Sequence, residues 1–186
     1  MELSPEDRKT IGEDIATLEF CWPVGMPKCL PMRGFKGLYE IRSNISSGRI
    51  ARILFVLIGN QMVLLHGFVK KTQKTPDKEL KVAATRMKRC SAMNENPHIG
   101  ESFDSFLRDE GIYDEVTATA IKRTLALQIE HEMVVQNISK SEMARRMKTS
   151  ASQLARLLDP ANDRIQLDTL VKAASAVGKS LAVGLV

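Results

Sequence analysis

Apolar and polar residues in the first half of the chain alternate in ways that predict a helix, a loop and then strands. Isoleucine and leucine recur at helical spacing over residues 4–20, where Ser4 can cap the helix and Pro5 fits its first turn. Prolines and glycines predict a loop over residues 21–36. β-Branched and aromatic residues then predict three antiparallel strands, at residues 37–44, 49–58 and 62–69.

The third predicted strand ends in a strongly basic segment. Alternation along a strand predicts one shared face for four of its residues, Met62, Leu64, His66 and Phe68. Three lysines within five residues follow, and Pro76 then suits the first turn of a helix predicted over residues 77–89. Burial explains the apolar residues but not the clustered charge, which favours phosphate, an acidic partner, or both.

The second half shows helical periodicity. Asparagine, proline and glycine predict a linker at residues 91–100, and an acidic stretch follows at 101–115. A long helix is predicted over about 114–136. Its apolar positions recur every four residues, at Ile121, Leu125, Ile129 and Met133.

Two short helices are predicted after the long one. Capping boxes begin at Ser139 and Ser150, and each predicts a helix start, so the helices cover roughly 140–147 and 151–158. A tight turn between two such helices is helix-turn-helix construction. The remaining pattern predicts a helix over 167–177 and suits a short terminal strand over 180–185.

Composition narrows the function classes. No apolar run approaches the roughly 18 residues that a membrane-spanning helix requires, and the first residues are not a signal peptide, so we expect a cytoplasmic protein with no membrane partner. The three cysteines are odd in number and lack metal-ligand spacing. We therefore predict neither a disulfide framework nor a metal site, and no cofactor.

Charge is unevenly distributed. Residues 1–92 hold 16 Lys and Arg against 9 Asp and Glu, whereas residues 93–186 hold 11 against 13. A basic first half joined to a mildly acidic second half indicates two modules that are complementary to each other. The acidic stretch at 101–115 is the expected partner of the basic surface. The alternative is an ordinary solvated helix start.

The basic first half carries candidate chemistry for RNA cleavage. Attack by a neighbouring 2′-hydroxyl needs a base, an acid, and cations for the developing phosphorane charge. We assign proton transfer to His66 and Tyr39, although a hydrogen-bonded core histidine and a packed strand tyrosine are the alternatives. Charge stabilisation in catalysis is assigned to Arg42, Arg52 and Lys70. RNA binding is assigned to Arg33, Arg49, Lys71 and Lys74.

Three motifs of the first half, residues 37–42, 48–52 and above all 64–76, resemble the HigB branch of RelE-type toxins. The resemblance covers about residues 3–90. It implies a helix pair on an antiparallel sheet, and a ribosome-dependent endoribonuclease, or mRNA interferase, that cuts translated mRNA. Members of that branch usually begin with a strand before the position of Ser4, and this sequence starts without it. An edge strand is therefore expected to be missing.

The second half resembles the matching HigA-like helix-turn-helix antitoxins, over about residues 93–186. The segments that carry this likeness are 100–107, 120–123, 140–147, 150–160 and 167–170. The resemblance implies that four side chains of the second short helix face the major groove of DNA: Ser150, Ser152, Gln153 and Arg156. Arg145 and Lys148 add positive charge. Lys148 stands where the turn often has glycine, so a positive φ is expected there.

Together these features predict an α+β protein with a toxin domain at 1–90, a linker at 91–100 and an antitoxin domain at 101–186. We expect the antitoxin half to neutralise the toxin half, to bind operator DNA as a homodimer, and to repress its own transcription. One alternative is a transcription regulator with a catalytically inactive toxin-like domain. Another is a nuclease that acts independently of any operator. A helical bundle that binds no DNA is the alternative for the second half.

Overall fold

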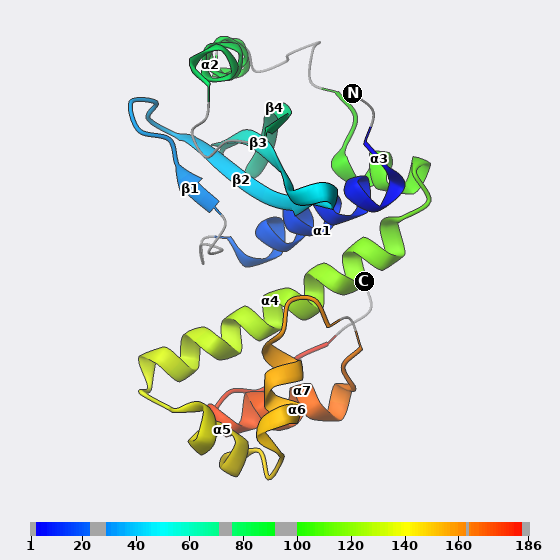
Figure 1. The fold of residues 1–186 in the computed structure, drawn as a ribbon. Helices are drawn as coiled ribbons and strands as arrows, with labels where there is room; N and C mark the ends of the chain where they lie inside the picture. The colour runs from blue at the N-terminus through cyan, green and yellow to red at the C-terminus, as the bar shows by residue number, and fades with distance from the viewer. Residues whose placement is uncertain (1–2, 23–28, 71–75, 92–99, 163, 184–186) are drawn as a thin grey trace. The chain divides into compact units, whose positions relative to one another are not determined.

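The protein is described by a computed structural model, in which α-helices accompany one antiparallel sheet (Figure 1). The residues that the structure describes are 3–22, 29–70, 76–91, 100–162 and 164–183. This is the predicted α+β class. None of the described helices is long and apolar enough to cross a membrane.

The chain forms two compact units, Met1–Thr117 and Ala118–Val186. The division falls inside helix α4 (Tyr113–Val135), so the first unit includes the acidic segment that the sequence assigns to the antitoxin half. Most of the predicted linker at 91–100 lies outside the described residues. The predicted domain boundary there stays a prediction.

Helix α1 (Pro5–Cys21) confirms the first predicted element. The Ser4 side chain accepts a hydrogen bond from the backbone N–H of Asp7 at 3.1 Å, which satisfies one of the free donors at the helix start. Proline lies in the first turn, and Glu6 and Asp7 place negative charge at the positive end of the helix dipole. The start of α1 is therefore fixed by local sequence.

The sheet has four antiparallel strands among the described residues, in the order β1-β2-β3-β4. Their bounds are Cys29–Pro31, Leu38–Ile45, Arg49–Ile58 and Gln61–Lys70. The three predicted strands are confirmed. The loop predicted over 21–36 is wrong at β1, because Cys29–Pro31 pairs with β2 and forms one edge of the sheet. Proline is tolerated there because an edge strand does not need every backbone donor.

A β-bulge in β4 overturns the predicted alternation of Met62, Leu64, His66 and Phe68. Leu54 of β3 lies opposite His66, but the next residue, Phe55, lies opposite Leu64. Leu65 is therefore the extra residue, and an extra residue reverses the faces of the residues before and after it. His66 and Phe68 consequently lie on the opposite face from Met62 and Leu64.

Helices α1 and α2 (Asp77–Ser91) cover opposite faces of this sheet (Figure 1). The α2 side has an apolar core in which Leu80 and Ala83 of the helix pack with Leu38, Leu54 and Leu65 of the strands. The predicted helix at 77–89 is thus confirmed, and its apolar stripe faces the sheet. Its other side is left to solvent.

On the outer side of α1, the segment that follows the linker completes the first unit. Helix α3 (Phe103–Asp109) and the start of α4 bury Leu107 and Val116, which are at most 1% exposed. Both lie against Gly12 of α1, where an added Cβ would stand 3.3 Å from Leu107 Cδ2. Glycine at this position allows the close approach of these elements.

The second unit packs the rest of α4 with α5 (Lys140–Arg146), α6 (Ala151–Leu158) and α7 (Leu167–Ala176). These helices confirm the predicted ones, and the core includes Ile129, Met133, Leu154 and Leu157. Ile121, expected in the same stripe, is instead 45% exposed. No strand is present over the described residues 180–183, and the end of the predicted terminal strand lies outside the described residues.

Candidate active site and nucleic-acid interface

His66 and Glu79 meet where β4 runs beside the first turn of α2. The His66 Nε2 atom lies 2.5 Å from Glu79 Oε2, and the two side chains are 18% and 24% exposed. The imidazole also stacks on Phe68, with 5.8 Å between ring centroids. A carboxylate on one ring nitrogen orients a histidine and stabilises its protonated form, as a general base requires. This histidine is hydrogen-bonded and only partly exposed.

Two arginines on the same face of the sheet share one carboxylate. Arg52 Nη1 lies 2.9 Å from both oxygens of Glu40, and Arg42 Nε lies 2.5 Å from one of them. Arg52 and Glu40 are at most 1% exposed, whereas the Arg42 side chain is 39% exposed. Because this ion pair is buried, it fixes the positions of the Arg52 and Glu40 side chains. Arg42 is therefore the one of these two arginines that can reach a ligand at the surface.

The strand register determines which of the predicted catalytic residues share a face. Arg42 lies opposite Arg52, Arg52 lies opposite Phe68, and His66 and Lys70 follow at even spacing along β4. Arg42, Arg52, His66 and Lys70 are thus brought to the α2 face of the sheet. Arg33 is exposed in the connection before β2. Lys71 and Lys74 lie outside the described residues.

Tyr39 is on the other face of the sheet, away from His66. Its ring stacks on Phe55 at 5.4 Å and meets the edge of Trp22 at 5.1 Å. These contacts match the alternative of a packed strand aromatic. The structure does not bring Tyr39 together with His66.

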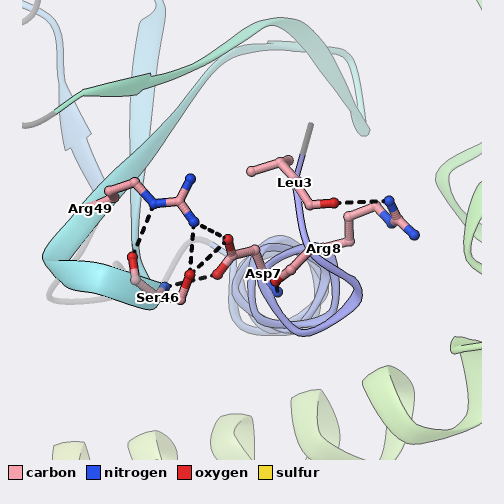
Figure 2. A network of polar contacts seen from close by, with 6 residues as sticks. Leu3, Asp7, Arg8, Ser46 and Arg49 are labelled. Carbon is pink, nitrogen blue, oxygen red and sulfur yellow. Dashed lines mark hydrogen bonds and ion pairs between the residues drawn. The ribbon is translucent and has the colours of Figure 1, made fainter. Parts of the chain in front are cut away.

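Arg49 takes part in a polar network that ties α1 to the β2–β3 turn (Figure 2). Asp7 accepts hydrogen bonds from Ser46 N at 2.8 Å, Ser46 Oγ at 3.1 Å and Arg49 Nη2 at 2.5 Å. The Ser46 backbone donor is the largest cause that holds the pKa of Asp7 below its usual value. Arg49 thus has a structural partner on the α1 face of the sheet.

The acidic segment pairs with α1. Glu110 Oε2 lies 2.8 Å from Arg8 Nε, and Glu115 forms an ion pair with Lys9. The sequence-based prediction paired this segment with the lysines after β4, of which Lys71 and Lys74 lie outside the described residues. The described contacts of Glu110 and Glu115 are on the α1 side instead.

Helices α5 and α6 present the predicted DNA-contacting residues on their surface. Ser139 and Ser150 accept hydrogen bonds from the third helical residue of α5 and α6, as the capping boxes predict. Lys148, in the turn between the helices, has the expected positive φ of 51°. Six predicted DNA-binding residues are exposed: Arg145, Lys148, Ser150, Ser152, Gln153 and Arg156.

Hydrogen bonds within this helix pair occupy some of those side chains. Arg145 and Arg146 both bind Glu142 at 2.8 Å, and this lowers the pKa of Glu142 to about 2. Ser150 Oγ lies 2.9 Å from Ser152 Oγ, and Thr149 donates to Gln153. Several of the predicted DNA-binding side chains therefore have partners within the helix pair itself.

Sequence reasoning missed Glu79 and Glu40. Glu79 carried no usable signal, because only the packing of α2 against β4 brings it to His66. Glu40 carried none, because only the pairing of β2 with β3 brings it against Arg52.

Comparison with known proteins finds a family match for the N-terminal part of the chain. Residues 1–88 match the family model described as phage-derived protein Gp49-like (DUF891). That family is related to the RelE- and HigB-like toxins of toxin–antitoxin systems. The match ends within α2, so it includes His66 and Glu79. No curated protein and no solved structure matches the chain.

Proposed function

We propose that the chain carries a toxin and its antitoxin in one polypeptide. The toxin part, residues 1–90, cuts translated mRNA. The part from residue 101 onward packs on it through residues 101–117, and its remainder, residues 118–186, restrains it and binds operator DNA. The observation that carries this proposal is the His66–Glu79 pair beside Arg42 and Lys70, within a region that matches a toxin-related family.

In the proposed reaction, His66 removes the proton of the RNA 2′-hydroxyl and Glu79 stabilises the imidazolium that forms. The 2′-oxygen attacks the adjacent phosphorus and the bond to the 5′-oxygen breaks, leaving a 2′,3′-cyclic phosphate. The 5′-oxygen takes its proton from water. Arg42 and Lys70 stabilise the additional negative charge on phosphorus, and Arg52 acts only by holding Glu40 in place.

The antitoxin part of the proposal is supported by α5 and α6. The exposed first turn of α6 offers hydroxyl and amide groups, and Arg156, in the last turn, is a suitable bidentate partner for guanine. Contact of residues 101–117 with α1 keeps the two parts together, and a covalent connection favours such contact through a high effective concentration.

Cleavage tests the toxin part of the proposal. Expression of residues 1–117, the compact first unit, should arrest growth and produce new mRNA ends, whereas the full chain should do so weakly or not at all. The His66→Gln variant of the fragment should be inactive. Lys36→Gln, an exposed change outside the site, should leave cleavage unchanged. If neither the fragment nor the full chain cuts RNA, the result favours a regulator with an inactive toxin-like domain.

DNA binding tests the antitoxin part separately. Full-length protein should shift the DNA upstream of its own coding sequence, and Arg156→Ala should weaken that binding by about 5- to 150-fold, the loss of one bidentate base contact. Lys179→Ala, an exposed change outside α5 and α6, is the matched control. If the wild-type protein shows no sequence-specific shift, the proposed repressor role is wrong.

A further inference from the structure

The outer side of α2 forms a basic hollow that the proposed function does not use. Its lining residues recur at helical spacing: Lys78, Lys81, Val82, Thr85, Arg86 and Arg89. This side is the reverse of the stripe that packs Leu80 and Ala83 on the sheet. Both carboxylates of α2, Asp77 and Glu79, lie outside the lining, and Glu79 is engaged with His66. We call this surface the α2 basic face.

Three cations of the α2 basic face lack, among the described residues, the ion-pair partners that Arg8, Lys9 and Arg49 have. Within the described part of the chain, Lys78, Lys81 and Arg89 make no ion pair. Like charges three residues apart, as at Lys78 and Lys81 or Arg86 and Arg89, repel each other in an isolated helix. Because a bound anion would reduce this repulsion, the surface favours an anionic ligand.

The α2 basic face adjoins the His66 site at the first turn of α2. Glu79, in the first turn of α2, contacts His66, and Arg86 Nη1 donates to the Leu65 carbonyl of β4 at 2.7 Å. From Lys78 to Arg89 the helix extends roughly 16 Å, at about 1.5 Å per residue. An extended anionic chain lying along it therefore reaches, at Lys78, the residue next to the carboxylate that contacts His66.

We propose that the α2 basic face binds the phosphates of single-stranded RNA next to the bond that is cut. This inference rests on the proposed function. The lining offers ammonium, guanidinium and hydroxyl donors, which suit phosphate oxygens and carry no base preference. The acidic segment of the chain itself is a poor occupant, because Glu110 and Glu115 already pair with α1.

The test measures RNA binding by full-length protein in a His66→Gln background, so that its result does not depend on cleavage. Lys78→Gln, Lys81→Gln and Arg89→Gln are combined in one variant. The control combines Lys36→Gln, Lys172→Gln and Lys179→Gln, three exposed lysines elsewhere that remove the same charge. Each protein is titrated against a labelled, unstructured 20-nucleotide RNA at several salt concentrations.

In the variant with the three α2 substitutions, the slope of log K against log salt concentration should be shallower by about 2 than in the control. Each single-strand phosphate contact contributes about 0.7 to this slope. Affinity at low salt should fall about 10- to 100-fold relative to the control. A circular dichroism spectrum and a thermal midpoint equal to wild type verify folding, and Lys81→Glu alone should reproduce the direction of the effect.

Equal slopes and affinities in the α2 variant and the control would overturn the inference. So would unchanged RNA binding together with lost binding of a poly-glutamate peptide, because that result would assign the surface to an acidic protein partner. A protein that never cuts RNA but shows the expected loss of binding would contradict the proposed nuclease and leave the RNA-binding surface standing.

Discussion

Helices α1 and α2 cover opposite faces of one sheet and use their charged residues differently. On α1, Arg8 and Lys9 pair with carboxylates of the acidic segment, and Asp7 binds Arg49. On the outer side of α2, Lys78, Lys81 and Arg89 form no ion pair within the described residues. The comparison separates charge that holds the unit together from charge that is available to a ligand.

The two faces of the sheet show the same difference. Tyr39 on the α1 side is packed among aromatic rings, whereas His66 on the α2 side is partly exposed and oriented by a carboxylate. We therefore expect substitutions on the α1 side to change stability and substitutions on the α2 side to change activity.

The largest effect is expected at His66. His66→Gln in residues 1–117 should lower the rate of mRNA cleavage about 10²- to 10⁴-fold, the usual contribution of a general base. Its urea unfolding curve should stay close to that of wild type, because the side chain is partly exposed. Cleavage rates come from timed sampling of mRNA ends. An unfolded variant, or one that cuts normally, would contradict the assignment of this face to catalysis.

The next effect is expected on the α1 side, at Leu107. Leu107→Ala removes a side chain that is 1% exposed and should lower the free energy of unfolding of the full chain by about 2–5 kcal/mol. Phe106→Ala, at a neighbouring residue that is 44% exposed, is the control and should cost much less. Urea denaturation measures both. Equal losses for the two variants would show that α3 does not pack on α1 as described.

A smaller, pH-dependent effect is expected at Asp7. Because the folded-state pKa of this carboxyl is lowered, its ionised form stabilises the protein above the usual aspartate pKa, and that stability is lost as pH falls through the lowered pKa. Asp7→Asn should therefore destabilise the chain near neutral pH and flatten the decline below about pH 4. Asp109→Asn, at an exposed position, is the control. If the stability of Asp7→Asn depended on pH as that of wild type does, the result would contradict the network of Figure 2.

The smallest effect on stability is expected on the outer side of α2. Lys81→Gln should change the free energy of unfolding by less than about 0.5 kcal/mol, since the side chain is exposed and has no ion-pair partner in the described part of the chain. Lys9→Gln, which removes the ion pair with Glu115, should cost up to about 1 kcal/mol. A larger loss for Lys81 than for Lys9 would reverse the comparison between the two helices.

Local signals predicted most of the fold. Ser4, Ser139 and Ser150 mark helix starts through their own hydrogen bonds, and β-branched and aromatic residues located β2, β3 and β4. Two features escaped because they depend on pairing. β1 is a strand only because β2 lies beside it, and the bulge at Leu65 is visible only in the register with β3.

The candidate site was predictable only in part, because it too depends on strand pairing. His66 and the cations were identified from their residue types, but their placement depends on the sheet. Strand pairing put Arg52 into a buried pair with Glu40 and put Tyr39 on the face opposite His66. Glu79 came to His66 through the packing of α2, which no single segment of the sequence encodes.

The most direct test of the account is the chemistry of the RNA ends made by residues 1–117 on ribosomes that translate a defined mRNA. Attack by the 2′-hydroxyl with His66 as base predicts a 2′,3′-cyclic phosphate on one fragment and a 5′-hydroxyl on the other, and no such ends with His66→Gln. Ends bearing a 3′-hydroxyl and a 5′-phosphate, or the same ends with His66→Gln, would contradict it.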